Sequence, residues 1–370
     1  MPLSYGIDAY WTETPSRVET EPVTEAPVFS GEVQDGPARQ VYLIPNDTLA
    51  ASKLLARLLQ EGFRVRMARL EFQVQGRRWP RGTLVLRVNR NPESLHRRLE
   101  QLTAEFGVDA VSVQHGLVEE GIDLGSNNIV SLPQPRIALL TESPVASYSY
   151  GALHYLFERE FGLSFTRVSA GDPGNLQDYN VIVMPSGNYG SVLRDDRLDA
   201  FKDWIRSGGT VVAVSGASAW LRGAGISEVK LLNGQPDPED EDRRIRPRRT
   251  PGAIVRVDLN PLSFLSYGVP ESVAVLVRSS TICRVFEDRP ARNVGVYAPR
   301  EDLRLSGFIW PQTERYLAGG GWLFLESYGR GKVISFVEDP NFRASYDGLN
   351  KLFLNAVLLS PGMTEFRLYE

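Results

Sequence analysis

The chain of 370 residues is poor in cysteine and histidine and has no excess of basic residues: it contains one cysteine and three histidines. A single cysteine cannot form a disulfide within the chain, so cysteine content says little about the compartment. The 41 basic residues face 45 acidic ones, and this net charge of −4 excludes a basic field for a nucleic-acid partner. Apolar runs stay below about 18 residues, so no membrane span is predicted.

The most regular part of the sequence is the stretch 135–221. Three unbroken apolar runs, at 137–140, Val181–Met184 and Thr210–Val214, are typical of strands buried on both faces of a parallel sheet. Between them lie two apolar stripes at helical spacing: Leu153, Leu156, Phe157 and Phe161, then Leu198, Phe201, Trp204 and Ile205. The stretch therefore predicts a doubly wound, mainly parallel α/β sheet.

Small and polar residues follow each of these runs, where the carboxyl ends of parallel strands gather ligands. Ser215 stands where a strand turns sharply into a helix through small residues, the geometry of a nucleophile elbow. The candidate ligand-binding residues at these strand ends are Ser186, Gly187, Asn188 and Gly216.

A serine hydroxyl becomes a nucleophile only beside a base, and the candidates for catalysis are Ser215 with Glu142 or His154. Each partner has a structural alternative. Glu142 could cap the helix that follows it, and His154 could be a partly buried helix residue beside Tyr155.

The rest of the chain divides into three parts. Residues 1–37, rich in Pro, Glu and Thr, predict an extended arm whose aromatic opening, PLSYGIDAYW, should pack on this chain or on a neighbour. Residues 38–130 predict a small α/β unit, with strands at 41–44, 63–68, 70–74, 83–88 and 110–113 and helices at 48–59 and 92–106. Residues 131–370 form the larger unit, interrupted at about 233–251 by a charged insertion expected to be solvated.

Past the insertion, strands are predicted at 254–257, 273–276 and 284–286, a hairpin at 321–326 and 332–337, and a helix at 349–359. The hairpin leads into a polar corner with Asp339, Asn341 and Arg343. These side chains suit either a polar site or a loop that caps its own backbone.

The elbow sequence VAVSGASAWL resembles the class I glutamine amidotransferase-like superfamily, with Ser215 at the cysteine position. Gly187, in MPSGNYG, falls at the family's oxyanion turn. The resemblance implies a flavodoxin/amidotransferase-like fold. Amidotransferase chemistry needs a thiolate, but Cys283 lies far downstream and no histidine follows Ser215, so a degenerate, non-catalytic domain is expected.

Nearly the whole chain also resembles the C-terminal region of long bacterial zinc carboxypeptidase family proteins. The matching phrases include PLSYGIDAYW, GRRWPRGTLVL, DLGSNNIVSLPQPRIALL and GRGKVISFVEDPNFRASYDGLNKLFLNAVLL. The resemblance implies a fragment that follows a zinc-bearing catalytic domain, in a secreted or periplasmic protein. Met1–Ser4 carry neither the charged nor the apolar region of a signal peptide, so export rests on the resemblance.

No zinc site and no other cofactor is expected in this chain. The family motif is His-x-x-Glu, whereas His96, His115 and His154 each have a glutamate four residues on. Of these pairs, His154 with Glu158 is expected to form a helix ion pair.

The leading hypothesis is a non-catalytic accessory region that scaffolds the carboxypeptidase catalytic domain, binds substrate or assembles a homo-oligomer. Two alternatives stay open. One is a cryptic serine hydrolase or amidase that uses Ser215, and the other is a small-molecule-binding module in the crevice beside it. A peptide or a small molecule is the expected kind of ligand.

Overall fold

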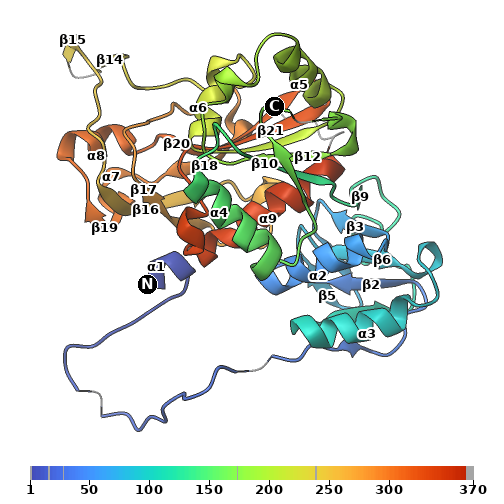
Figure 1. Cartoon of the computed structure of the whole chain (residues 1–370). Helices are drawn as coiled ribbons and strands as arrows, with labels where there is room; N and C mark the ends of the chain where they lie inside the picture. The colour runs from blue at the N-terminus through green and yellow to red at the C-terminus, as the bar shows by residue number, and fades with distance from the viewer. Residues whose placement is uncertain (1, 16, 28, 173, 238–239, 364–370) are drawn as a thin grey trace.

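The computed structural model describes residues 2–15, 17–27, 29–172, 174–237 and 240–363. Residues 238–239 of the predicted insertion and 364–370 of the predicted larger unit lie outside these ranges. Figure 1 shows an extended N-terminal arm, a small unit built on β2, β3 and β6, and a larger unit around a central sheet.

The larger unit is built on one sheet whose strands differ in direction from one side to the other. Its order is β11 (Thr166–Ser169), β10 (Ile137–Thr141), β12 (Val181–Met184), β13 (Thr210–Val214), β21 (Gly331–Phe336), β20 (Gly321–Tyr328), β18 (Asn293–Tyr297), β16 (Gly252–Leu259) and β17 (Ser272–Val277), with β19 (Arg304–Phe308) also on β16. Neighbours from β11 to β21 are parallel, and the later neighbours are antiparallel. The parallel part has the 2-1-3-4-5 order of flavodoxin-like sheets, which confirms the predicted doubly wound α/β fold.

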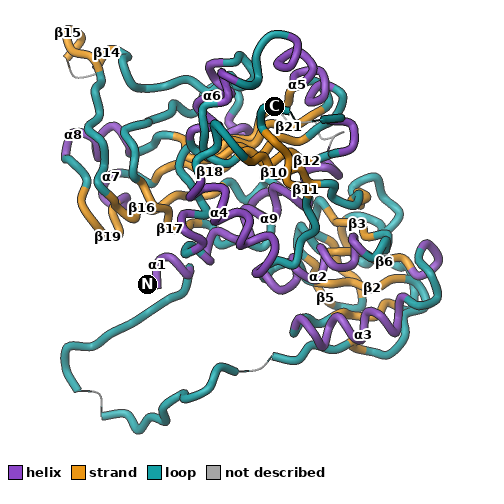
Figure 2. Tube along the Cα trace, viewed as in Figure 1, coloured by secondary structure: helices purple, strands orange, loops and turns teal. Residues whose placement is uncertain are grey.

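Helices cover both faces of the parallel strands. α4 (Ser147–Tyr155) and α9 (Asn350–Leu358) pack into the core on one face. α5 (Asp196–Arg206) and α6 (Gly216–Gly223) pack on the other, as Figure 2 lets the reader follow. Ile137 and Leu139 of β10 contribute to the first core, and Ala138 and Leu140 to the second, because side chains alternate along a strand. Both faces need apolar cover, which explains the unbroken apolar runs.

The small unit has a ferredoxin-like β-α-β-β-α-β order. Its sheet runs β1 (Val33–Gln34), β7 (Ala110–Val113), β2 (Val41–Ile44), β6 (Leu84–Arg87), β3 (Val65–Ala68) and β9 (Ile129–Leu132). The helices α2 (Leu49–Gln60) and α3 (Leu95–Phe106) cover one face. A second small sheet covers the other, formed by β5 (Arg77–Trp79), β4 (Phe72–Val74) and β8 (Glu120–Gly121). Antiparallel neighbours from β7 to β3 define this split β-α-β arrangement.

Two local predictions for the part of the chain after α6 differ from the structure. The strand expected at 284–286 is a loop, in which the Phe286 N–H donates to Asn293 Oδ1. In the charged insertion, β14 (Pro236–Asp237) pairs with β15 (Asp240–Arg244), and buried Asp237 accepts a hydrogen bond from Arg315 of α8 (Pro311–Leu317). The insertion therefore docks on α8, which follows the short helix α7 (Arg300–Leu303).

The N-terminal arm begins with α1 (Pro2–Tyr5), which lies beside the turn Asp347–Leu349 of the larger unit. Of the two predicted alternatives for its aromatic rings, packing on this chain is not formed beyond α1, and packing on a neighbour stays a prediction. Tyr10 is 92% exposed and Trp11 is 87% exposed.

A buried lysine joins the two units. Lys351 of α9 donates from Nζ to Asn46 Oδ1 and to Ser52 Oγ, both at 3.0 Å, and both acceptors belong to the small unit. Burial lowers the pKa of Lys351 to about 7, although Asp47 acts in the opposite direction. The native contact therefore holds a lysine that gives up its proton more readily than in the unfolded chain.

This pKa predicts how stability varies with pH. The folded pKa lies below the unfolded value, so the unfolded chain binds more protons above pH 7, and stability should rise with pH in that range. Urea unfolding between pH 7 and 9 should give wild type a slope larger than that of Lys351→Met, by up to about 1 kcal/mol per pH unit. Lys230→Met changes an exposed lysine and should keep the wild-type slope. Equal slopes for wild type and Lys351→Met would contradict the assignment.

Candidate functional site

Ser215 sits in a strained turn between β13 and α6. Its φ is 50° and its ψ is −108°, outside the regions that serine ordinarily adopts. Its N–H donates to the Phe336 carbonyl on the adjacent strand β21 at 2.8 Å. Strain of this kind persists only where the surroundings fix the backbone, and it gathers at functional sites. The conformation agrees with the elbow expected from the sequence.

Gly216 lets two turns meet at this elbow. Its N–H donates to Ser186 Oγ at 3.2 Å, and a Cβ on Gly216 would lie 2.9 Å from that oxygen and 3.0 Å from the Gly187 nitrogen. The Ser186 N–H in turn donates to Ser149 Oγ of α4 at 3.0 Å. The turns after β12 and β13 and the first turn of α4 are thus held together by short polar contacts.

These turns form one wall of a cleft of about 270 Å³ at the carboxyl edge of the parallel strands. Its lining combines serines, arginines and two carboxylates: Ala146, Tyr148, Ser149, Ser186, Ser215, Arg249, Leu276, Arg278, Ser279, Glu338, Asp339, Phe342 and Arg343. The opposite wall comes from β17 and from the segment after β21, so the antiparallel half of the sheet completes the cleft.

Two carboxylates follow shortly after β21: Glu338 is buried and Asp339 is half-buried. Burial raises the pKa of Asp339 to about 6, partly offset by hydrogen bonds from the Asn341 N–H, at 2.9 Å, and from Ser149. Burial also raises the pKa of Glu338, whose Oε1 accepts from the Ser279 N–H at 3.0 Å. Both groups are therefore more easily protonated than ordinary carboxylates.

The rim of the cleft is cationic. The guanidinium groups of Arg278 and Arg343 lie 4.4 Å and 5.3 Å from the centre of the Phe342 ring. Arg249 donates from Nε to the Arg278 carbonyl at 3.2 Å. Arg343 and Ala344 both have positive φ, 55° and 51°, so a second strained turn faces the first. The polar corner at Asp339 and Arg343 thus belongs to the same cleft as Ser215.

The structure does not bring the two candidate bases to Ser215. Glu142 is exposed, accepts from Ser169 Oγ at 2.8 Å and lines a separate hollow beside Tyr150. His154 lies further along α4, which runs back from the carboxyl edge of the sheet, and its ring packs between Tyr150 and Phe165.

The His154 side chain has another partner: its Nδ1 lies 3.4 Å from Glu158, which confirms that helix pair. Within the described part of the chain, the Ser215 hydroxyl forms no hydrogen bond.

Two further candidate residues, Asn188 and Cys283, do not contribute side chains to the cleft at Ser215. Asn188 turns its Oδ1 to the Gly190 N–H at 3.2 Å and caps its own turn, so it does not line the cleft. Cys283 is fully buried, and burial raises the pKa of its thiol to about 11, so a thiolate is disfavoured there.

In the described residues, no group of three or more His, Cys, Asp or Glu side chains could hold a metal ion. The described helices also include none long and apolar enough to cross a membrane.

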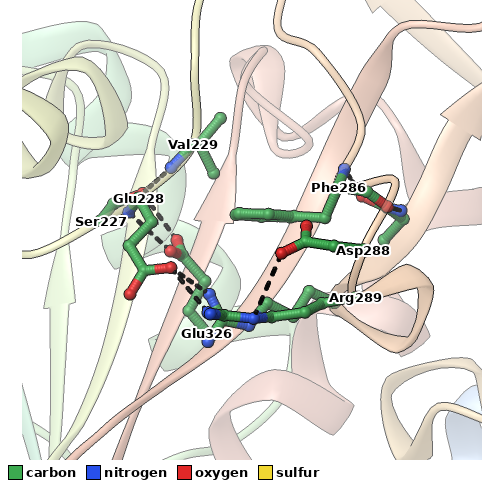
Figure 3. Close-up of polar contacts among 9 residues, drawn as sticks. Ser227, Glu228, Val229, Phe286, Asp288, Arg289 and Glu326 are labelled. Carbon is green, nitrogen blue, oxygen red and sulfur yellow. Dashed lines mark hydrogen bonds and ion pairs between the residues drawn. The ribbon is translucent and has the colours of Figure 1, made fainter. Parts of the chain in front are cut away.

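A second polar cluster, shown in Figure 3, surrounds the buried Glu326 of β20. Its Oε2 accepts from Ser227 Oγ at 2.6 Å and its Oε1 from the Glu228 N–H at 2.7 Å. Arg289 and Arg292 bind the Glu228 carboxylate at 2.9 and 2.7 Å. Both oxygens of Glu326 are occupied by the chain itself, so this cluster fastens the loop after α6 to β20 rather than offering a site.

The contact at Gly216 can be tested with two glycines of the same helix. Gly216→Ala should lower the free energy of unfolding by about 1–3 kcal/mol, because the new methyl group overlaps Ser186. Gly223→Ala adds a methyl group where nothing lies within 4 Å and should change stability by less than about 1 kcal/mol. Chemical unfolding measures both, and equal effects would show that the two turns are not tightly packed.

No protein-family model matches the chain, and no curated protein matches it either. Among solved structures, a ThuA-like protein from Parabacteroides merdae is 12% identical, over 61% of this chain and 90% of its own, with a TM-score of 0.40. PurLQS from Thermotoga maritima is 15% identical, over 60% and 97%, with a TM-score of 0.38. A β-galactosidase from Bacillus circulans is 9% identical, over 88% of this chain and 48% of its own, at 0.32. Because the similarity is this low, the fold assignment rests on the strand order, and no function is inferred from these structures.

Proposed function

We propose that this chain is a non-catalytic binding module whose cleft at Ser215 holds a small polar ligand. One observation carries the proposal: the elbow keeps its strained turn, but the groups that share its cleft are arginines and carboxylates instead of an imidazole or a thiolate. A serine without an adjacent base is a weak nucleophile. The same groups are well suited to hold a ligand.

The charges of the cleft favour a ligand with two different ends. Three arginines at the rim favour a carboxylate or another planar anion, which a guanidinium can bind with two parallel hydrogen bonds. Glu338 and Asp339 are less exposed than the arginines, and they favour a hydroxyl or amino group that donates a hydrogen bond to them. A volume of about 270 Å³ lies just below the usual range for drug-sized ligands, which favours a small molecule.

For the longer protein to which this chain would belong, we propose a secreted or periplasmic bacterial zinc metallocarboxypeptidase, with this chain as its accessory region. This proposal rests on the sequence phrases it shares with that family. The zinc and the peptide-cleaving groups would then lie in a separate catalytic domain. The described part of this chain would bind a peptide or small molecule, scaffold that domain or assemble a homo-oligomer.

One observation favours a second candidate, a serine hydrolase or amidase. The positive φ of Ser215 is the strain that an exposed nucleophile would need, and Asp339, with a pKa of about 6, lines the same cleft. Against this, the Asp339 carboxyl is engaged by Ser149 and by the Asn341 N–H.

Ligand binding can be tested by thermal unfolding with a panel of small hydroxy acids, dicarboxylic acids and acetylated dipeptides at 10 mM. At least one class should raise the Tm of wild type and lose this effect in Arg278→Gln, because ligands stabilise the state they bind. Arg167→Gln, a change at an exposed arginine of β11 outside the cleft, should respond like wild type.

Two outcomes would overturn the proposal. One is the absence of any Tm increase across the panel. The other is hydrolysis of p-nitrophenyl esters by wild type that Ser215→Ala abolishes, which would support the hydrolase instead.

A further inference from the structure

A second cavity lies in the small unit, away from Ser215, and it is strongly cationic. Its volume is about 570 Å³, and it is lined by the end of α2, by β3 and β9 and by the segment that leads from β9 to the larger unit. Four arginines line it: Arg64, Arg66, Arg87 and Arg90. No aspartate or glutamate is among the described residues of its lining.

The chain leaves these charges uncompensated. Among the described residues, none of the four arginines has an ion-pair partner. Glu61, three residues before Arg64, is held by Arg98 of α3 at 2.6 Å. The buried Nε of Arg66 has no hydrogen-bond partner in the described part of the chain. Burial, and then the neighbouring charge of Arg87, lower the pKa of Arg66.

The Asn91 side chain fixes the backbone around the arginines without any ligand. Its Oδ1 accepts from the Arg64 N–H at 2.7 Å, and its Nδ2 donates to the Arg64 and Arg87 carbonyls at 3.1 and 2.9 Å. The ends of β3 and β6 are thereby held together, with like charges side by side. One guanidinium N–H of Arg87 is occupied by the Leu124 carbonyl, which orients the group.

Arg66 and Arg87 are half-buried, and like charges in such a position raise the energy of the fold unless an opposite charge joins them. A guanidinium binds phosphate and carboxylate groups with two parallel hydrogen bonds, so several of them around one cavity favour a ligand with several negative charges. Leu59 and Phe63 add apolar surface beside the charges. The volume lies within the range of small-molecule sites.

We propose that this cavity binds a small polyanion, a molecule that carries a phosphate group or several carboxylates. The site is distinct from the cleft at Ser215 and does not depend on the function proposed for it. Because Leu132, Pro133 and Gln134 belong to its lining, the ligand contacts the segment that joins the two units.

The probes are pyrophosphate and citrate, titrated into the full chain by calorimetry at low ionic strength. At least one should bind saturably, and the stronger of the two identifies phosphate or carboxylate chemistry. Arg66→Gln and Arg87→Gln should each weaken binding at least tenfold. Arg97→Gln, at an exposed arginine of α3 outside the cavity, should stay within twofold of wild type.

A stability measurement separates a lost site from a lost fold. Without a ligand, Arg66→Gln should have a Tm equal to or above that of wild type, because a desolvated charge next to Arg87 is removed. Three results would overturn the proposal: no saturable binding of either probe, equal binding by wild type and Arg66→Gln, or an effect reproduced by sodium chloride at matched ionic strength. Tighter binding of a short single-stranded oligonucleotide than of both probes would also overturn it, in favour of a nucleic-acid surface.

Discussion

The parallel pairing of β13 with β21 determines where the chemistry of this protein can lie. The two strands are in register from Thr210 with Lys332 to Val214 with Phe336. The next contact, from the Ser215 N–H to the Phe336 carbonyl, carries this pairing into the elbow. It places Ser215 beside the segment that follows β21, which includes Glu338 and Asp339. The groups beside the elbow are therefore two acids with raised pKa values, which fits the proposal that the turn binds a ligand instead of serving as a nucleophile.

The rest of the larger unit supports this edge. Two apolar cores, one on each face of the parallel strands, hold the strand ends in place, and the strained turns at Ser215 and Arg343 face each other across the cleft. The antiparallel extension contributes Arg278 from the end of β17. The small unit docks through α2 and the buried Lys351 on the face that carries α9. Its own cationic cavity adjoins the segment that connects the two units, so the molecule offers two charged hollows of different character.

Much of the fold could be predicted from the sequence, because strands buried on both faces have a pattern that few other elements share. Val181–Met184 and Thr210–Val214 were predicted with the bounds they have in the structure. β18 was missed because Gly295 interrupts its pattern, and that glycine is required where a Cβ would lie 2.9 Å from the Trp322 ring. β11 was missed because it is an edge strand with exposed residues. At the site, Ser186, Ser215 and Gly216 came from the sequence, whereas Arg249 and Arg278 did not, because their position depends on how the antiparallel strands extend the sheet.

The central claim, that the elbow at Ser215 binds without catalysing, is most directly tested by covalent labelling. The full chain would be treated with a fluorophosphonate probe between pH 6 and 9, and adducts at residue 215 would be counted by mass spectrometry against Ser215→Ala. The account predicts no labelling of Ser215 above the level of unactivated serines elsewhere in the chain. A stoichiometric adduct on Ser215 whose rate of formation rises with pH would contradict it, because it would reveal a base that activates the hydroxyl.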